Sequence, residues 1–136
     1  MAIKVEITTP FGKVYEDTAD MVIVPAELGE LGILPGHTPY LANLSMGVMR
    51  IKKDSNTEYF AANKGFVEIN PDRVEVLCET CENAKKIDIN RAIEARDRAV
   101  FRLKERKKGV DLQRAEIALK KALLRLKTAN VSKIYQ

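Results

Sequence analysis

Apolar and polar residues alternate in the first half of the chain, with the period of two that is typical of half-buried β-strands. Residues 3–7 give the clearest example, and short apolar runs follow at residues 21–24, 48–51, 59–60, 66–69 and 74–77. Turn-forming residues separate the runs: Asp-Ser-Asn at 54–56 predicts a hairpin, and Asn-Pro-Asp-Arg at 70–73 predicts a type I turn. Many short strands at close spacing predict a β-sandwich or a β-barrel.

The period changes in the second half of the chain, where apolar residues recur every three or four positions, as in a helical heptad seam. The seam consists of Leu112, Ala115, Leu119, Ala122, Leu126 and Ala129, and a similar face upstream consists of Ala92, Ala95, Ala99 and Leu103. Asp88 and Asp111 are the expected N-caps of two helices. The segment 107–110 allows a left-handed C-cap at Gly109 and a short reversal. The pattern predicts an antiparallel helical hairpin, in which alanines let the helix axes approach closely.

Composition limits the class of protein. The 136 residues are 46% apolar and 31% charged, which suits a folded soluble chain of one compact domain, or of one small domain with an appendage. No run approaches the roughly 18–20 apolar residues of a membrane span, and charges interrupt the N-terminus where a signal peptide has its apolar segment. Two cysteines make no disulfide framework, which fits a reducing compartment. We therefore expect the chain in the cytoplasm, or attached to something there.

Charge and chain-breaking residues divide the sequence near residue 86. Residues 1–86 carry a net charge of −4 and residues 87–136 carry +8, and all five prolines lie at or before Pro71. The expected domains are therefore 1–86, rich in strands, and 87–136, a helical hairpin. Their opposite charges favour contact. A hairpin of two helices of about 20 residues buries little by itself, so it needs a surface on which to dock.

Three local motifs point only weakly to chemistry. Cys78 and Cys81 form a single CxxC motif, which ends a strand and lacks further ligands for zinc, so a structural role is the favoured interpretation. His37 has no nearby cysteine and no serine with an obvious acidic partner to suggest a triad, so it is expected to be a loop or packing residue. The segment 29–39 around it is rich in glycine but lacks the spacing and the Gly-Lys-Ser/Thr ending of a phosphate loop.

The basic helical half has two possible ligands. Only Phe101 and Tyr135 are aromatic after residue 86, so nucleic-acid bases have no stacking platform there. Arg91, Arg98 and Arg102 share one side of the first helix, while Lys121 and Arg125 lie four apart on the second. Cations that converge from facing helices can hold a polyanion such as a triphosphate.

Two signatures make the chain resemble the epsilon subunit of the bacterial F-type ATP synthase over essentially its full length. They are Gly-Glu-Leu-Gly-Ile-Leu-Pro-Gly-His at 29–37 and Ile-Asp-Ile-Asn-Arg-Ala at 87–92, which is similar to the family's ATP-binding motif. The resemblance implies an α+β fold: an N-terminal β-sandwich of two five-stranded sheets, then an antiparallel two-helix hairpin.

The resemblance also implies a function without catalytic residues. The chain would be a central-stalk (rotor) subunit of a proton-translocating ATP synthase, bound to the gamma subunit, the c-ring and the alpha/beta catalytic head. It would be a peripheral protein at the cytoplasmic face of the bacterial cell membrane, reaching the membrane only through the complex. The subunit would take part in ATP synthesis and proton transport, coupling the head to the ring. Its C-terminal helices would inhibit ATP hydrolysis.

The family motif further implies ATP as a regulatory ligand that favours the folded hairpin, with the need for Mg²⁺ left open. The residues that match the family's nucleotide contacts are Glu82, Asp88, Arg91, Ala92, Arg98, Lys121 and Arg125. Lys121 departs from the arginine of tight binders, and a lysine offers a point charge where arginine offers a bidentate fork. Glu30 and His37 match positions near the edge that faces the rotor ring and gamma.

Two other classes of function compete with this interpretation. A small nucleic-acid-binding adaptor would use the basic hairpin, and binding lost at moderate salt without sequence preference would reveal mere electrostatics. A free-standing ATP-hydrolysing enzyme is disfavoured, because the sequence has no Walker lysine, no metal-ligand cluster and no obvious catalytic base. Coupling to H⁺ or to Na⁺ is a property of another subunit.

Overall fold

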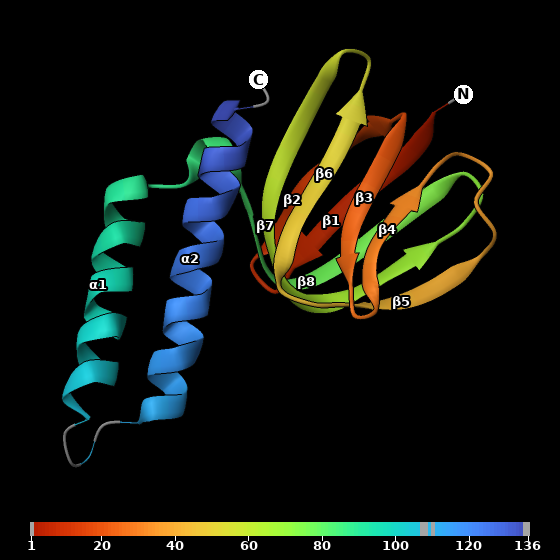
Figure 1. The fold of residues 1–136 in the computed structure, drawn as a ribbon. Helices are drawn as coiled ribbons and strands as arrows, with labels where there is room; N and C mark the ends of the chain where they lie inside the picture. The colour runs from red at the N-terminus through yellow and green to blue at the C-terminus, as the bar shows by residue number, and fades with distance from the viewer. Residues whose placement is uncertain (1, 107–108, 110, 135–136) are drawn as a thin grey trace.

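The structure, a computed structural model, describes residues 2–106, 109 and 111–134 (Figure 1). Its strands are β1 (Ile3–Thr9), β2 (Gly12–Ala19), β3 (Met21–Ala26), β4 (Gly29–Ile33), β5 (Tyr40–Leu44), β6 (Gly47–Lys53), β7 (Asn56–Ile69) and β8 (Arg73–Asn83). A short 3₁₀ helix, η1 (Ala84–Lys86), leads to α1 (Ile89–Glu105) and α2 (Leu112–Ile134). The fold is the expected α+β arrangement of a β-sandwich followed by two packed helices.

The two layers of the sandwich share their two longest strands. One layer has the order β2-β1-β8-β7-β5, and the other is built from β4, β3 and β6 together with the first half of β7 and the end of β8. Each layer therefore contains five strands, although the described residues hold eight strands in all. Sequence patterns at residues 59–60 and 66–69 suggested two strands, but both belong to β7.

A bend in β7 lets this strand pass from one layer to the other. Lys64 has a φ of +36°, and a Cβ on the next residue, Gly65, would lie 1.8 Å from the carbonyl oxygen of Leu77 on β8. Only glycine permits such a close approach of two backbones. The interruption that looks like a strand end in the sequence is this bend.

Alternation places one face of each strand in the core. In β1, Ile3, Val5 and Ile7 have no exposed surface, whereas Lys4 is exposed. The same core takes side chains from β3, β6, β7 and β8, and all its residues lie between Ile3 and Cys81. The predicted turn at 54–56 is a two-residue hairpin turn of Asp54 and Ser55 between β6 and β7. The predicted turn at 70–73 joins β7 to β8, and the Asn70 N–H donates to the Arg73 carbonyl (2.8 Å).

Both predicted N-caps are present. Asp88 Oδ1 accepts from the Arg91 backbone N–H (3.1 Å), and Asp111 Oδ1 accepts from that of Arg114 (3.0 Å). The expected C-cap at Gly109 is wrong: α1 ends at Glu105, and its C-cap is Arg106, which has a left-handed φ of +47°. Gly109 also has a positive φ, +91°, but it lies beyond the cap in the connection. The neighbouring positions of that expected reversal, Lys107, Lys108 and Val110, lie outside the described residues.

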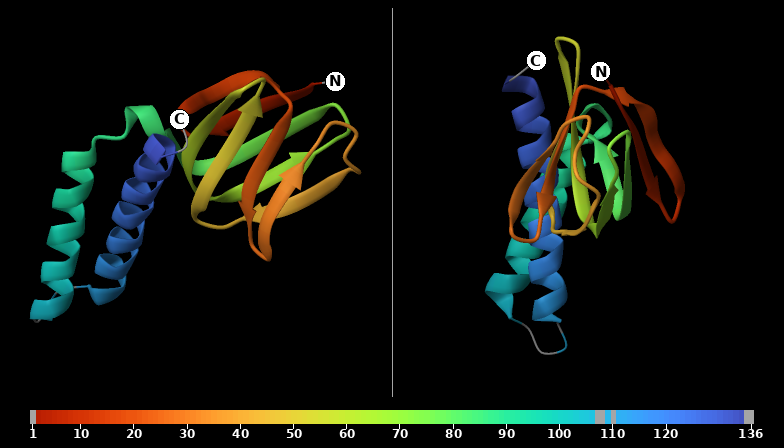
Figure 2. Two further views of the ribbon diagram at one scale, coloured as in Figure 1. Left: turned by 45° about the horizontal axis from the view of Figure 1, so that its top comes forward. Right: turned by 90° about the vertical axis from the view of Figure 1, so that its right-hand side faces the viewer.

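The helices pack through small residues. Ala115, Ala122 and Ala129 of the seam are buried, as are Ala92 and Ala99 of α1, while Leu119 and Leu126 are half-buried. Figures 1 and 2 show α2 between α1 and the sandwich. The hairpin is therefore docked mainly by α2, across the outer face of β6 and β7.

Candidate functional site

A bidentate ion pair joins the sandwich to the helical hairpin. The guanidinium of Arg125, on α2, donates from Nε to Glu82 Oε1 (2.9 Å) and from Nη2 to Glu82 Oε2 (3.2 Å). Glu82 lies near the end of β8, in register with Ala61 of β7, which is in turn in register with Val48 of β6. These two of the predicted site residues are therefore in direct contact, although 43 positions separate them in the sequence.

The matched motif forms the first turn of α1. Asp88 caps the helix through Oδ1, and the side chain of Arg91 is exposed to solvent. Ala92 has no exposed surface, so in this arrangement its small size serves the packing of the hairpin. A ligand at this turn would meet the exposed edge formed by Asp88 and Arg91, with Ala92 behind it.

Two further predicted cations lie along the hairpin. Arg98 on α1 and Lys121 on α2 are both exposed. Because the helices are antiparallel and their described ends meet at residues 105 and 112, Lys121 lies at about the level of Arg98, and Arg125 at about the level of Arg91. The fold thus places cations on both helices of the hairpin, and guanidinium and ammonium groups are donors from which a phosphate accepts hydrogen bonds.

The structure separates Glu30 and His37. Glu30 is the second residue of β4 and makes an ion pair with Arg50 of β6. His37 lies beyond the other end of β4, in the loop to β5, where its Nδ1 is 2.6 Å from the Thr38 carbonyl oxygen. The Gly36 N–H, which donates to the Pro71 carbonyl (2.7 Å), ties this loop to the turn between β7 and β8. The two residues therefore form no single cluster.

The CxxC motif spans the region where β8 changes layers. Cys78 is buried in the core, Cys81 packs against the same core, and both are free thiols. A hydrogen bond with Cys78, together with burial, raises the pKa of the Cys81 thiol. A thiol that resists ionisation is a poor nucleophile and a poor metal ligand, in keeping with a structural role. Among the described residues, no group of three or more His, Cys, Asp or Glu side chains is arranged to hold a metal ion.

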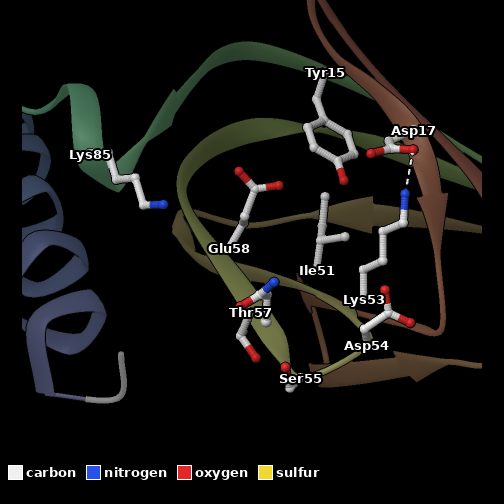
Figure 3. Close-up of a pocket in the computed structure, with 10 residues that line it drawn as sticks. Tyr15, Asp17, Ile51, Lys53, Asp54, Ser55, Thr57, Glu58 and Lys85 are labelled. Atoms are coloured by element: carbon white, nitrogen blue, oxygen red, sulfur yellow. Dashed lines mark hydrogen bonds and ion pairs between the residues drawn. The ribbon is translucent and has the colours of Figure 1, made fainter.

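A cavity lies away from these residues, between β2, the β6–β7 hairpin and η1 (Figure 3). It has a volume of about 620 Å³, and its lining includes Tyr15, Asp17, Lys53, Glu58 and Lys85. Burial first, and then the charges of Glu58 and Asp17, raise the pKa of Tyr15 to about 12. Lys53 Nζ and Asp17 Oδ1 form an ion pair at 2.8 Å. No local sequence pattern predicts this cavity, because its walls come from three separate segments of the chain, residues 15–17, 51–58 and 85.

None of the described helices has the length and apolar character needed to span a membrane. The fold and the hairpin surface define a class of protein: a β-sandwich that carries a docked, basic, antiparallel helical hairpin. Comparison with known proteins defines the class more closely. Residues 2–84 match the family described as "ATP synthase, Delta/Epsilon chain, beta-sandwich domain", and residues 85–130 match "ATP synthase, Delta/Epsilon chain, long alpha-helix domain".

Individual relatives agree with these matches. The chain is 52% identical over 101 residues to the ATP synthase epsilon chain of Bacillus subtilis, covering 74% of this chain and 76% of the relative. It is 49% identical over 104 residues to that of Bacillus velezensis, with 76% and 79% covered. In fold it is similar to a chain of the Euglena gracilis mitochondrial ATP synthase (OSCP/F1/c-ring), at a TM-score of 0.79 and 19% identity, with 95% of this chain and 81% of that chain covered. A chain of the Tetrahymena thermophila mitochondrial enzyme (central stalk/c-ring) gives a TM-score of 0.55 at 16% identity, with 100% and 98% covered.

The chain belongs to the delta/epsilon family of ATP synthase chains, and within it to the epsilon chains, noncatalytic subunits of the central stalk in F-type ATP synthases. It is thus part of an ATP synthase complex. Because the chain belongs to this family, the alternative interpretations as a nucleic-acid adaptor and as a free-standing hydrolase are not retained.

Proposed function

We propose that this epsilon chain regulates its ATP synthase through an ATP-dependent equilibrium of the helical hairpin. In the folded state the hairpin binds ATP and stays docked on the sandwich. In the extended state the helices lie along gamma, reach the alpha/beta head and block ATP hydrolysis. The complex would translocate protons, with this chain at the cytoplasmic face of the bacterial membrane.

One observation carries the proposal: the predicted nucleotide contacts come from three separate elements that only the folded hairpin brings together. Glu82 lies on β8, Asp88, Arg91, Ala92 and Arg98 belong to α1 or its cap, and Lys121 and Arg125 lie on α2. A ligand that touches all three elements binds the folded state and loses most of its contacts when the helices separate. Differential affinity of this kind is what shifts a conformational equilibrium.

Each contact has an available chemical group. The Oδ2 of Asp88 is left over after capping by Oδ1, so it can accept from the amino group of adenine. The exposed side chains of Arg91, Arg98 and Lys121 can donate to the phosphates. Arg125 is shared with Glu82, which orients the guanidinium and leaves Nη1 for the ligand.

The contact between the hairpin and the sandwich is small enough for ATP binding to decide whether the hairpin stays docked. Besides the Glu82–Arg125 pair, the cluster at the junction consists of Ala61, Ile87 and Ala129, with Ile89 and Leu124 packed against it. ATP at a hundredfold excess over its Kd stabilises the state that binds it by about 2.7 kcal/mol. An equilibrium balanced to within a few kcal/mol responds to this change.

The outer face of the other layer offers a surface for gamma. Phe66 of β7 is in register with Leu77 of β8, and Leu77 is in register with Thr8 of β1. Phe66 and Leu77 are more than 40% exposed, and Leu41 on β5 is 65% exposed. Contiguous apolar surface of this kind marks a protein contact. We assign this surface to gamma, and we assign Glu30 and His37, which lie at opposite ends of β4, to separate contacts with the c-ring and the edge of gamma.

Fluorescence energy transfer tests the proposal in the assembled head-plus-gamma complex. One dye is placed on the sandwich and the other near residue 130, and the distance is measured with and without saturating ATP. We expect a shorter distance with ATP. The control is the Arg91→Ala variant, which should keep the long distance at the same ATP concentration. An unchanged distance in the unaltered chain would mean that the hairpin does not sense nucleotide, even if ATP binds.

A further inference from the structure

A second, smaller crevice lies where the docked α2 meets the β3–β4–β6 side of the sandwich. Its volume is about 260 Å³, and its walls are Pro25, Glu30, Gly47, Val48, Arg50, Lys127 and Val131. Five of these residues belong to the sandwich, while Lys127 and Val131 belong to α2. The crevice is therefore formed only while the helix is docked.

Two cationic side chains with unused hydrogen-bond donors line this crevice beside apolar residues, and Glu30 lines it as the ion-pair partner of Arg50. Arg50 contacts Glu30 through one terminal nitrogen, Nη2, so its Nε and Nη1 are left without a partner among the described residues. Lys127 likewise makes no hydrogen bond or ion pair within the part of the chain that the structure describes. Pro25, Val48 and Val131 supply an apolar surface beside these two cations.

We propose that this crevice binds a small organic carboxylate with an apolar body. The carboxylate would accept one charge-assisted hydrogen bond from Arg50 Nη1 and one from Lys127 Nζ, because the other terminal nitrogen of Arg50 is taken by Glu30. The body would pack against Pro25, Val48 and Val131. The volume is just below the range of about 300–1,000 Å³ typical of drug-sized ligands, so the ligand is a small one.

Such a ligand is an effector distinct from ATP, since none of the crevice residues belongs to the predicted nucleotide site. It contacts α2 and the sandwich together, so it stabilises the docked hairpin. At ten times its Kd it raises the ratio of docked to undocked chains about elevenfold. This regulatory consequence rests on the proposed opening of the hairpin, whereas the binding step does not.

The binding step is tested on the full, isolated ¹⁵N-labelled chain by NMR titration with 3-phenylpropionate. The neutral 3-phenylpropionamide is the matched probe without charge. We expect saturable shifts at the amides of Val48, Arg50, Lys127 and Val131 with the carboxylate. Lys127→Gln should weaken binding by about fivefold, the size of one exposed ion pair. Lys120→Gln, an exposed lysine of the same helix outside the crevice, should leave it unchanged.

Shifts scattered over the chain, equal binding of the amide, or equal affinity in Lys127→Gln and the unaltered chain would overturn the proposal. Loss of the ATP response in the energy-transfer experiment would leave these shifts in place, so the two proposals fail separately.

Discussion

Single side chains decide how the two parts of this chain are joined. Asp88 begins α1 with its side chain, and Glu82, only six positions earlier, holds α2 through Arg125. Both residues also belong to the proposed nucleotide site. The residues that define the start and the docking of the hairpin are therefore the ones through which a ligand can change it.

At the scale of the residue, the first prediction concerns Arg91. Arg91→Ala should weaken ATP binding by about 1.5–3 kcal/mol, roughly tenfold or more, because it removes one charge-assisted hydrogen bond. Isothermal titration calorimetry on the isolated chain measures the change. The matched control is Arg96→Ala on the same helix, since Arg96 pairs with Asp97 and lies outside the predicted site. Equal losses in both variants would indicate diffuse attraction between charges and would contradict a defined site.

The second prediction concerns the pH dependence of stability through Tyr15. Its pKa is raised from 10.0 to about 12 in the folded chain, chiefly by burial. Between these two values the unfolded chain loses the phenol proton while the folded chain keeps it. The contribution of Tyr15 to stability is therefore complete below pH 10 and is lost as the pH rises toward 12.

Urea unfolding between pH 8 and 11 measures this effect. The midpoint should fall more steeply above pH 10 in the unaltered chain than in Tyr15→Phe, which keeps the edge-on contact with Phe60 (ring centroids 5.5 Å apart). Parallel pH profiles of the two chains would contradict the prediction.

At the scale of the element, β7 and α2 each serve two purposes. The 14-residue β7 belongs to both layers, and its first half also packs against α2. The α2 helix uses one side for α1 and another for the sandwich, and both contacts rely on alanine. Small side chains allow close approach at a modest gain in buried area, which suits a contact that must also open.

The third prediction tests this docking contact. Ala129→Leu should undock the hairpin, because Ala129 is buried in the cluster with Ala61 and Ile87, and overpacking costs typically about 1–3 kcal/mol. Energy transfer between the sandwich and α2 should fall, while the unfolding of the sandwich itself stays unchanged. Asn130→Leu, at the exposed neighbouring position, is the control and should stay docked. An unaltered distance in Ala129→Leu would show that the junction does not limit docking.

At the scale of the whole molecule, the core of the sandwich is independent of the helices. Its residues come from Ile3 to Cys81, and no described residue of α1 or α2 contributes to it. The helices contact the sandwich through a separate, small apolar cluster at the junction and through the Glu82–Arg125 ion pair. The described core of the sandwich is thus complete without side chains from α1 or α2.

The fourth prediction follows from this division. A fragment of residues 1–86 should fold alone, because it retains the entire core, and it should still join gamma while losing the inhibition proposed for the helices. Circular dichroism and cooperative thermal unfolding test its folding, and co-purification with gamma tests its binding. A fragment that is unfolded by circular dichroism would contradict a domain boundary at residue 86.

Much of the local structure was predictable from the sequence. The alternation at residues 3–7 correctly predicts β1, and the two turn motifs correctly predict the hairpins on either side of β7. Both aspartate N-caps are also in place. The strands β2, β4 and β5 gave no comparable signal: most of β2 is exposed, and β4 contains two glycines in five residues. The C-cap was misplaced because an ordinary arginine, Arg106, adopts the left-handed conformation ahead of Gly109.

The sequence by itself determined the period of each half, the two aspartate N-caps and, through two motifs, the family. Its division near residue 86 stays a prediction. These features depend on residues a few positions apart, whose interactions are the same wherever the segment lies. Only the tertiary structure decided that β7 serves both layers, that Glu30 meets Arg50 and that Glu82 holds Arg125. These partners are 20 and 43 positions apart, and they meet because the burial of a shared core fixes which strands and helices lie side by side.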